Sequence, residues 1–134
     1  MAPSEAIRDI PASSLFFLKQ IKTLCQSNDA ELILVSTPST LNWNYANHNG
    51  IEAFAKEQNL KYIDMNLMPD QLSINWNTDT RDKGDHLNDN GAKKVSRWLA
   101  DYLTEIYDLV DHRSDSHYSS WNVALSRYRQ LVAK

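Results

Sequence analysis

The chain has 134 residues, a length that suits one domain and argues against two. Hydrophobic residues make up 42% and charged residues 23%, as in an ordinary globular protein, and a net charge of −3 offers no basic surface for nucleic acid. No apolar run approaches the roughly 20 residues that cross a bilayer, and the first residues lack a signal-peptide pattern. A single cysteine excludes an internal disulfide, three glycines are too few for a phosphate-binding loop, and nothing in the composition fixes a compartment.

The first predicted element is a helix that begins after a lead-in segment. Residues 1–12 are polar and contain two prolines, so we assign them to that segment. Ser13 or Ser14 can cap the helix. Its apolar stripe consists of Leu15, Leu18, Ile21, Leu24 and Cys25. Phe16 and Phe17 widen this stripe, so we expect the helix to pack on a sheet.

Two apolar segments predict strands that alternate with helices. Residues 31–36 contain an unbroken apolar run at 32–35, which is typical of a parallel strand covered on both faces. A helix over residues 45–58 separates it from a second strand over residues 60–65. The residues of that helix that we expect to face inward are Ile51, Phe54 and Ala55. This alternation predicts an α/β domain with a parallel sheet.

A long segment without periodicity, residues 66–89, precedes two further helices. Loops of this length are usually functional or disordered, and the acidic cluster here favours a functional loop. A helix over residues 90–107 follows, capped by Asn88, Asp89 or Asn90. Its apolar face consists of Ala92, Val95, Trp98, Leu99, Tyr102, Leu103 and Ile106. After a polar linker at 111–115, a helix over 119–132 is expected to pack through Trp121, Leu125, Tyr128 and Leu131.

Two strands are too few for a stable open sheet, because its edges would stay unpaired. Strands hidden in other segments, a partner chain that completes the sheet, or membership of a larger domain would each explain the shortage. We favour the larger domain. The same shortage predicts self-association through an exposed sheet edge.

The segment from residue 79 to 92 carries the strongest chemical signal. His86 stands among Asp79, Asp82, Asp85 and Asp89, directly before a predicted helix. A histidine with a carboxylate close enough to orient it is half of a general-base apparatus. A turn at Gly84 would bring Asp82 to the ring, with the adjacent Asp85 in reserve. The alternative is a solvated loop whose carboxylates stabilise the helix N-terminus, which we expect for Asp89 and Asp79.

Other candidate residues carry weaker signals. Ser36 and Ser39 follow a strand end, where open α/β sheets place their sites, and either could act as a nucleophile. Pro38 argues against this, because it lies where the helix behind a nucleophile would begin. Side chains that could line a cleft at the same edge, or simply pack, are Trp43, Tyr45, His48 and Asn49. We expect no metal ion, since the EF-hand pattern fails at Thr80, where glycine is required.

Several blocks together resemble the C-terminal half of SGNH (GDSL-type) hydrolases, most closely the bacterial branch associated with cell-surface polysaccharides. The blocks are residues 31–39, 43–49, 62–64 and 82–92, followed by a similar tail at 111–121. The resemblance covers about residues 13–125. It implies a partial flavodoxin-like three-layer α/β/α sandwich with a short parallel sheet, and it implies no cofactor. Residues 1–134 would then be one SGNH hydrolase-like domain, the C-terminal part of a larger one.

The same resemblance implies a serine esterase or O-acyltransferase-like domain acting on ester-linked acyl groups of a small molecule or carbohydrate. In such enzymes an Asp-x-x-His loop supplies the base, and here only this part maps, with His86 as the base. Lys83 stands where the family has aspartate, so we assign the orienting role to Asp82, then Asp85. The family's Gly-Asp-Ser and Gly-x-Asn-Asp blocks are absent from this sequence. The alternative is a catalytically inactive SGNH-like binding or structural module.

Overall fold

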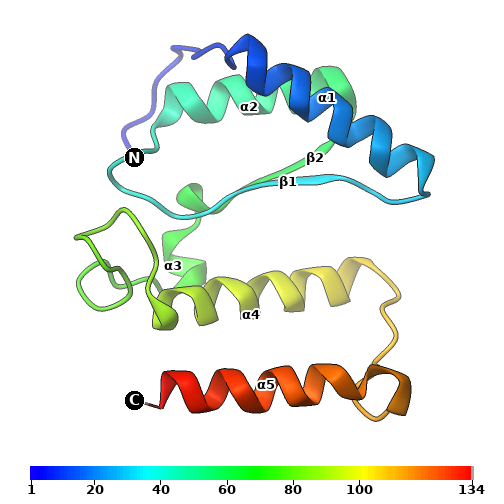
Figure 1. Cartoon of the computed structure of the whole chain (residues 1–134). Helices are drawn as coiled ribbons and strands as arrows, with labels where there is room; N and C mark the ends of the chain where they lie inside the picture. Colours follow the sequence, from blue (N-terminus) through cyan, green and yellow to red (C-terminus); the bar gives the residue numbers. More distant parts are fainter. Residues whose placement is uncertain (134) are drawn as a thin grey trace.

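Two short parallel strands lie between the helices of this chain (Figure 1). In the computed structural model, which describes residues 1–133, β1 (Ile33–Ser36) pairs with β2 (Lys61–Asp64). Ile33 lies opposite Lys61 and Ser36 opposite Asp64, so both strands end at the same edge of the sheet. The α/β class and the parallel pairing are therefore confirmed, and each strand is two residues shorter than the sequence predicts.

Helices lie on both sides of this sheet (Figure 1). α1 (Ala12–Ser27) and α2 (Tyr45–Gln58) lie on one side, while α4 (Asp89–Ile106) lies on the other, with α5 (Ser119–Val132) beyond it. The remaining elements are short: the 3-10 turn η1 (Met65–Leu67) after β2, the single helical turn α3 (Pro69–Leu72), and the 3-10 turn η2 (Ser116–Tyr118) before α5. No helix within residues 1–133 combines the length and apolarity that crossing a bilayer demands.

The main core lies between β2 and α4. Its buried members are Ile63, Met65, Leu72 and Val95, of which Met65 has no exposed surface. The predicted apolar face of α4 packs against this cluster through Trp98, Leu99 and Tyr102, and the Trp98 and Tyr102 rings stack 5.3 Å apart. On the opposite side of the sheet, α2 buries Phe54 and Ala55 as its periodicity predicts.

Side-chain caps fix where two of the helices begin. The Asn44 side chain accepts a hydrogen bond from the Asn47 amide at the start of α2. The Asn88 side chain accepts from the amides of Asn90 and Gly91 at the start of α4, so Asn88 is the cap among the three candidates. The predicted Ser13 or Ser14 cap of α1 is wrong: that helix starts earlier, at Ala12, behind Pro11, whose fixed φ already suits helix entry.

The segment expected to be a structureless loop holds local helical structure. Besides η1, a single helical turn, α3 (Pro69–Leu72), starts with proline at its first position and ends at Ser73 in the left-handed region. Leu72 is buried against the core. A four-residue helix shows too little of the 3.6-residue period to be read from sequence.

The predicted packing of α5 is wrong, although its bounds agree with the prediction. None of its residues is buried, and Trp121 remains 74% exposed. The tie to α4 is a hydrogen bond from the Tyr128 hydroxyl to the Asp89 carboxylate. Apolar periodicity predicts a stripe on a helix, but here α4 already uses its own apolar face against β2, so the α5 stripe meets no core.

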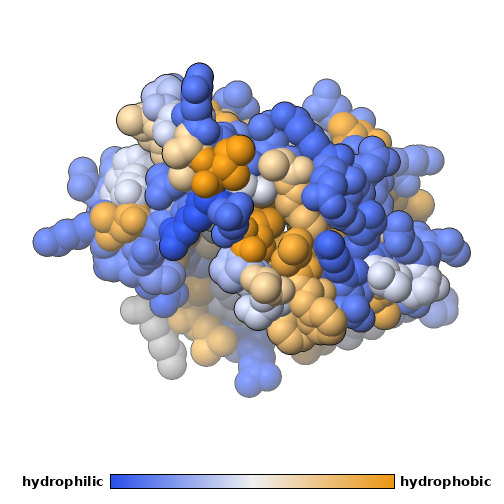
Figure 2. All heavy atoms as spheres, turned by 90° about the horizontal axis from the view of Figure 1, so that it is seen from above, coloured by the Kyte–Doolittle hydropathy of each residue, from blue (hydrophilic) through white to orange (hydrophobic). Residues whose placement is uncertain are grey.

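Coverage of the sheet and of α1 is likewise less complete than predicted. No residue of β1 is buried and Val35 is 38% exposed, so this strand is not covered on both faces. A cavity of about 440 Å³ separates β1 from α4 near Val35 and Leu103. Phe16 and Phe17 are also exposed, and apolar patches stand out on the face shown in Figure 2. A two-stranded sheet is too narrow to cover the flanking helices.

Candidate functional site

The loop before α4 folds back on itself at the carboxyl ends of the two strands. Thr80 and Leu87 form an isolated antiparallel bridge, and the Arg81 amide donates to the His86 carbonyl at 2.9 Å. The loop reverses at Lys83 and Gly84, which both have positive φ, 59° and 117°. A Cβ on Gly84 would also stand 2.1 Å from the Thr40 hydroxyl, so only glycine fits the turn. This turn positions His86.

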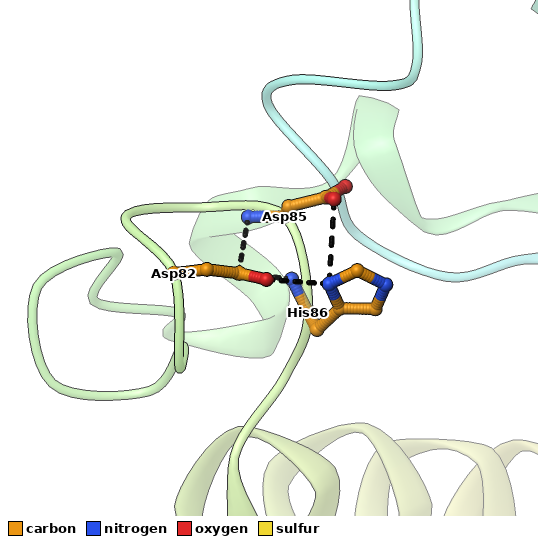
Figure 3. A group of neighbouring side chains, drawn as sticks. All are labelled: Asp82, Asp85 and His86. Atoms are coloured by element: carbon orange, nitrogen blue, oxygen red, sulfur yellow. Dashed lines mark hydrogen bonds and ion pairs between the residues drawn. The ribbon is translucent and has the colours of Figure 1, made fainter.

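The reversal brings Asp82 to the imidazole of His86 (Figure 3). Asp82 Oδ2 lies 2.5 Å from His86 Nδ1, while Asp82 Oδ1 accepts from the His86 amide at 2.7 Å. Asp85 Oδ2 lies 3.3 Å from the same ring nitrogen. The contact that the turn at Gly84 predicts is therefore present. The catalytic roles of His86, Asp82 and Asp85 remain predictions.

The two carboxylates change the protonation of the ring. The hydrogen bond to Asp82, followed by the negative charges of Asp85 and Asp82, raises the pKa of His86, while desolvation and then the nearby Arg81 charge oppose this. The pKa of Asp82 is lowered, first by the His86 amide and then by its ring. A larger share of the imidazole is thus protonated at neutral pH. The neutral form that a general base needs increases as the pH rises through the raised pKa.

A small polar pocket adjoins this ring. It has a volume of about 380 Å³ and is lined by Val35, Ser36, Thr37, Ser39, Asn42, Trp43, Asp85 and His86. The His86 side chain is 72% exposed, so it stands at the rim. A larger cavity of about 530 Å³ lies at the opposite, amino ends of the strands, and no histidine lines it.

Neither candidate serine is hydrogen-bonded to His86. The Ser36 hydroxyl pairs with the Tyr62 hydroxyl at 3.0 Å. The Ser39 hydroxyl donates to Asp85 Oδ1 at 2.9 Å. The structure thus brings Ser36, Ser39 and His86 to one pocket but engages both serines with other partners.

Asp79 and Asp89 take different structural roles. Asp79 is 3% exposed and accepts hydrogen bonds from Lys94 Nζ at 2.6 Å and from the Asn75 amide at 2.8 Å, which lower its pKa. Its prediction as a solvated carboxylate is wrong, because it ties the loop to α4. Asp89 lies in the first turn of α4 and pairs with Lys93, as expected for a helix N-terminus.

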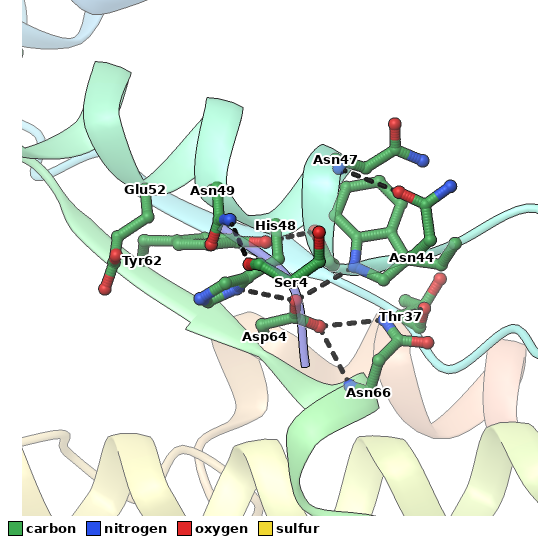
Figure 4. A network of polar contacts seen from close by, with 12 residues as sticks. Ser4, Thr37, Asn44, Asn47, His48, Asn49, Glu52, Tyr62, Asp64 and Asn66 are labelled. Carbon is green, nitrogen blue, oxygen red and sulfur yellow. Dashed lines mark hydrogen bonds and ion pairs between the residues drawn. The ribbon is translucent and has the colours of Figure 1, made fainter. Parts of the chain in front are cut away.

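A buried network beneath the site was missed by sequence reasoning (Figure 4). Asp64, at the end of β2, is 5% exposed and accepts from Trp43 Nε1 and pairs with His48 Nδ1, each at 2.9 Å. Its other oxygen accepts from the amide and the side chain of Asn66. The available signal was an acidic residue at the end of an apolar strand, which needs partners when it is buried.

The cluster at the rim has the residue types of a metal site. Ligand atoms of Asp82, Asp85 and His86 all lie within 4.8 Å of one another. Nδ1 of the ring is already hydrogen-bonded to Asp82, and acidic groups at a surface often gather without an ion. We therefore assign no metal ligands here.

Comparison with known proteins gives no assignment. No family model, curated protein or solved structure matches this chain.

Proposed function

We propose that this chain supplies the histidine and aspartate half of an SGNH (GDSL-type) serine esterase or O-acyltransferase site. The observation that supports this most strongly is the contact of Asp82 with His86 Nδ1 beside a polar pocket, at the carboxyl ends of parallel strands. Open α/β sheets place their sites at this edge. Under this proposal the fold is part of a flavodoxin-like three-layer sandwich, which helices on both sides of the sheet support.

The geometry suggests how the half-site works. Asp82 holds the proton of neutral His86 on Nδ1, which leaves Nε2 to take the proton from an attacking hydroxyl. That hydroxyl oxygen bonds to the acyl carbon of the ester, and Nε2 returns its proton to the departing alcohol. The nucleophile comes from outside residues 1–133, since Ser36 and Ser39 are engaged elsewhere.

The lining of the pocket supports an ester of a small molecule or carbohydrate as substrate. Three polar residues, Ser36, Thr37 and Asn42, line the pocket together with Trp43. Polar groups around an aromatic side chain suit a polyhydroxylated ligand, which needs both hydrogen bonds and a flat apolar surface. No cofactor enters the proposed chemistry.

Hydrolysis of p-nitrophenyl acetate tests the base role of His86. We expect wild-type turnover within about tenfold of the buffer rate, because losing a nucleophile costs orders of magnitude. His86→Gln should remove the small increment that remains, and that increment should grow as the pH rises through the raised pKa of His86. Ser36→Ala should leave most of that increment in place, because the Ser36 hydroxyl bonds Tyr62 and not His86.

A matched control is His117→Gln. His117 is also exposed and hydrogen-bonded to an aspartate, Asp115, but it lies outside the pocket. Equal rates for wild type and both glutamine variants would favour the second candidate, a catalytically inactive SGNH-like module. The observation that favours this second candidate is that the Ser39 hydroxyl donates to Asp85 and not to His86. Robust turnover that Ser36→Ala abolishes would instead place the nucleophile within this chain.

The partner proposal concerns the sheet edge. Within residues 1–133 the sheet has two strands, so each has one unpaired edge, and Val35 of β1 is partly exposed. We expect the isolated chain to self-associate through the unpaired edge of β1. Light scattering coupled to size exclusion should give a mass that increases with protein concentration, and Val35→Lys should reduce it. A constant mass of 15.4 kDa at all concentrations would contradict self-association.

A further inference from the structure

The Ser39 hydroxyl acts both as a hydrogen-bond donor and as an acceptor. Its hydroxyl donates to Asp85 Oδ1 and accepts from the Asn42 amide at 3.1 Å. Asn42 in turn donates from its side chain to the same Asp85 oxygen at 2.6 Å. Two neighbours thus hold one carboxylate oxygen. A serine whose proton is committed to a carboxylate is poorly placed to attack a substrate, but well placed to fix that carboxylate.

A second pair of contacts ties the same two segments together. The Thr40 amide donates to the Gly84 carbonyl at 2.8 Å, and the Thr40 hydroxyl donates to the same oxygen at 3.2 Å. Residues 39–42, which follow β1, are therefore hydrogen-bonded to residues 84–85, which immediately precede His86. The Thr40 contacts hold the backbone of Gly84, the residue before Asp85. The Ser39 contact holds the Asp85 side chain itself.

We propose that Ser39 is a positioning residue of the site: its hydroxyl fixes Asp85, and through Asp85 the imidazole of His86, beside the pocket. The proposal rests on the proposed function only in calling this imidazole a base. The tie itself is a chain of contacts from Ser39 Oγ to Asp85 Oδ1, and from Asp85 Oδ2 to His86 Nδ1 at 3.3 Å.

The Ser39 backbone is hydrogen-bonded to Asn66, just after the buried end of β2. Its amide donates to Asn66 Oδ1 at 2.7 Å, and Asn66 is 8% exposed. The Asn66 side chain donates in turn to the Thr37 carbonyl at 3.0 Å and to buried Asp64 at 2.8 Å. Ser39 is therefore tied to buried polar groups at the carboxyl ends of the strands, whereas His86 stands on an exposed turn. A fixed support of this kind limits the positions that a mobile side chain samples.

Asp82 and Asp85 make different contacts around His86. Asp82 bonds both the ring and the backbone of His86 within the loop, but no contact in the described residues ties Asp82 to the strands. Asp85 has its side chain only 16% exposed and joins the loop to the sheet edge. The charged groups that act on the ring are Asp82, Asp85 and the opposing Arg81. Releasing Asp85 would remove one source of negative charge from the ring.

The pKa of His86, followed by NMR of its ring carbons, tests the proposal in the whole chain. Ser39→Ala should lower this pKa, because a released Asp85 spends less time near the ring. Ser39→Thr, which keeps a hydroxyl, should restore most of the loss. Asn42→Ala removes the other side-chain donor to Asp85 and should lower the pKa in the same direction. Asp82→Asn should lower it further, since Asp82 is the larger influence.

Two controls separate positioning from a general loss of structure. Ser36→Ala removes a hydroxyl at the end of β1 that bonds Tyr62 instead, and it should leave the pKa of His86 unchanged. In an Asp85→Asn background, Ser39→Ala should have no further effect. An unchanged pKa in both Ser39→Ala and Asn42→Ala, or an undiminished effect in the Asp85→Asn background, would overturn the proposal. Because this readout needs no turnover, it stands or falls separately from the ester test.

Discussion

Asp64→Ala is expected to destabilise the folded chain by about 4 kcal/mol. The substitution removes the carboxylate at the centre of a buried polar network and leaves buried donors without an acceptor. The carboxylate is 5% exposed, and four polar atoms contact it, from Trp43, His48 and Asn66. Removing it leaves the Trp43 indole N–H and the Asn66 amide without acceptors. Urea denaturation should show a lower midpoint with an unchanged slope.

Two comparisons define the size of this effect. Asp64→Asn keeps one oxygen for Asn66 but turns its NH2 group toward both Trp43 and His48, so we expect a smaller loss than for alanine. Asp101→Ala, at an exposed position of α4, should stay within about 0.5 kcal/mol of wild type. An Asp64→Ala loss no larger than that of Asp101→Ala would show that the network contributes little to stability.

Gly91→Ala is expected to cost about 2–3 kcal/mol, although alanine is the better helix former. The added Cβ would stand 2.3 Å from the Asp79 carbonyl oxygen and 2.9 Å from Leu87 Cδ2. That carbonyl cannot easily withdraw, because it accepts the Asn88 amide at 2.9 Å and Asp79 is itself held by Lys94. The first turn of α4 therefore packs too closely on the loop for any side chain.

The control for this prediction is Ala100→Gly on the exposed face of the same helix. It should cost about 1 kcal/mol from helix propensity alone. Chemical denaturation should then show a lower free energy of unfolding for both variants, although one replaces glycine by alanine and the other replaces alanine by glycine. If Gly91→Ala instead raised the free energy of unfolding, the close approach of α4 to Asp79 would not exist in solution. The loop that carries His86 would then pack less closely on α4.

Local sequence signals predicted the secondary elements well where they were long. The α2 helix has the predicted bounds, because Asn44 starts it and Asn59 accepts a left-handed conformation at its end. The face of α4 around Val95 and Trp98 packs as its period predicts. By contrast, α3 was missed because four residues carry no readable period.

The site shows the same division between local and distant information. Asp82 and His86 are four residues apart, so a single turn at Gly84 was enough to predict their contact. The contact of Ser39 with Asp85 spans 46 residues, and that of Trp43 with Asp64 spans 21. No local pattern encodes such pairs, so the sequence predicts neither the contact of Ser39 with Asp85 nor the buried partners of Asp64.

The sequence by itself determined the α/β alternation, the bounds of α2 and α5, and the carboxylate beside His86, because each depends on residues close together along the chain. Only the tertiary structure decided which apolar stripes are covered. It left α5 and β1 largely exposed because burial depends on the area that neighbouring elements offer, and a two-stranded sheet offers little. It also decided that Ser39 faces Asp85, since that depends on how two distant loops meet at one sheet edge.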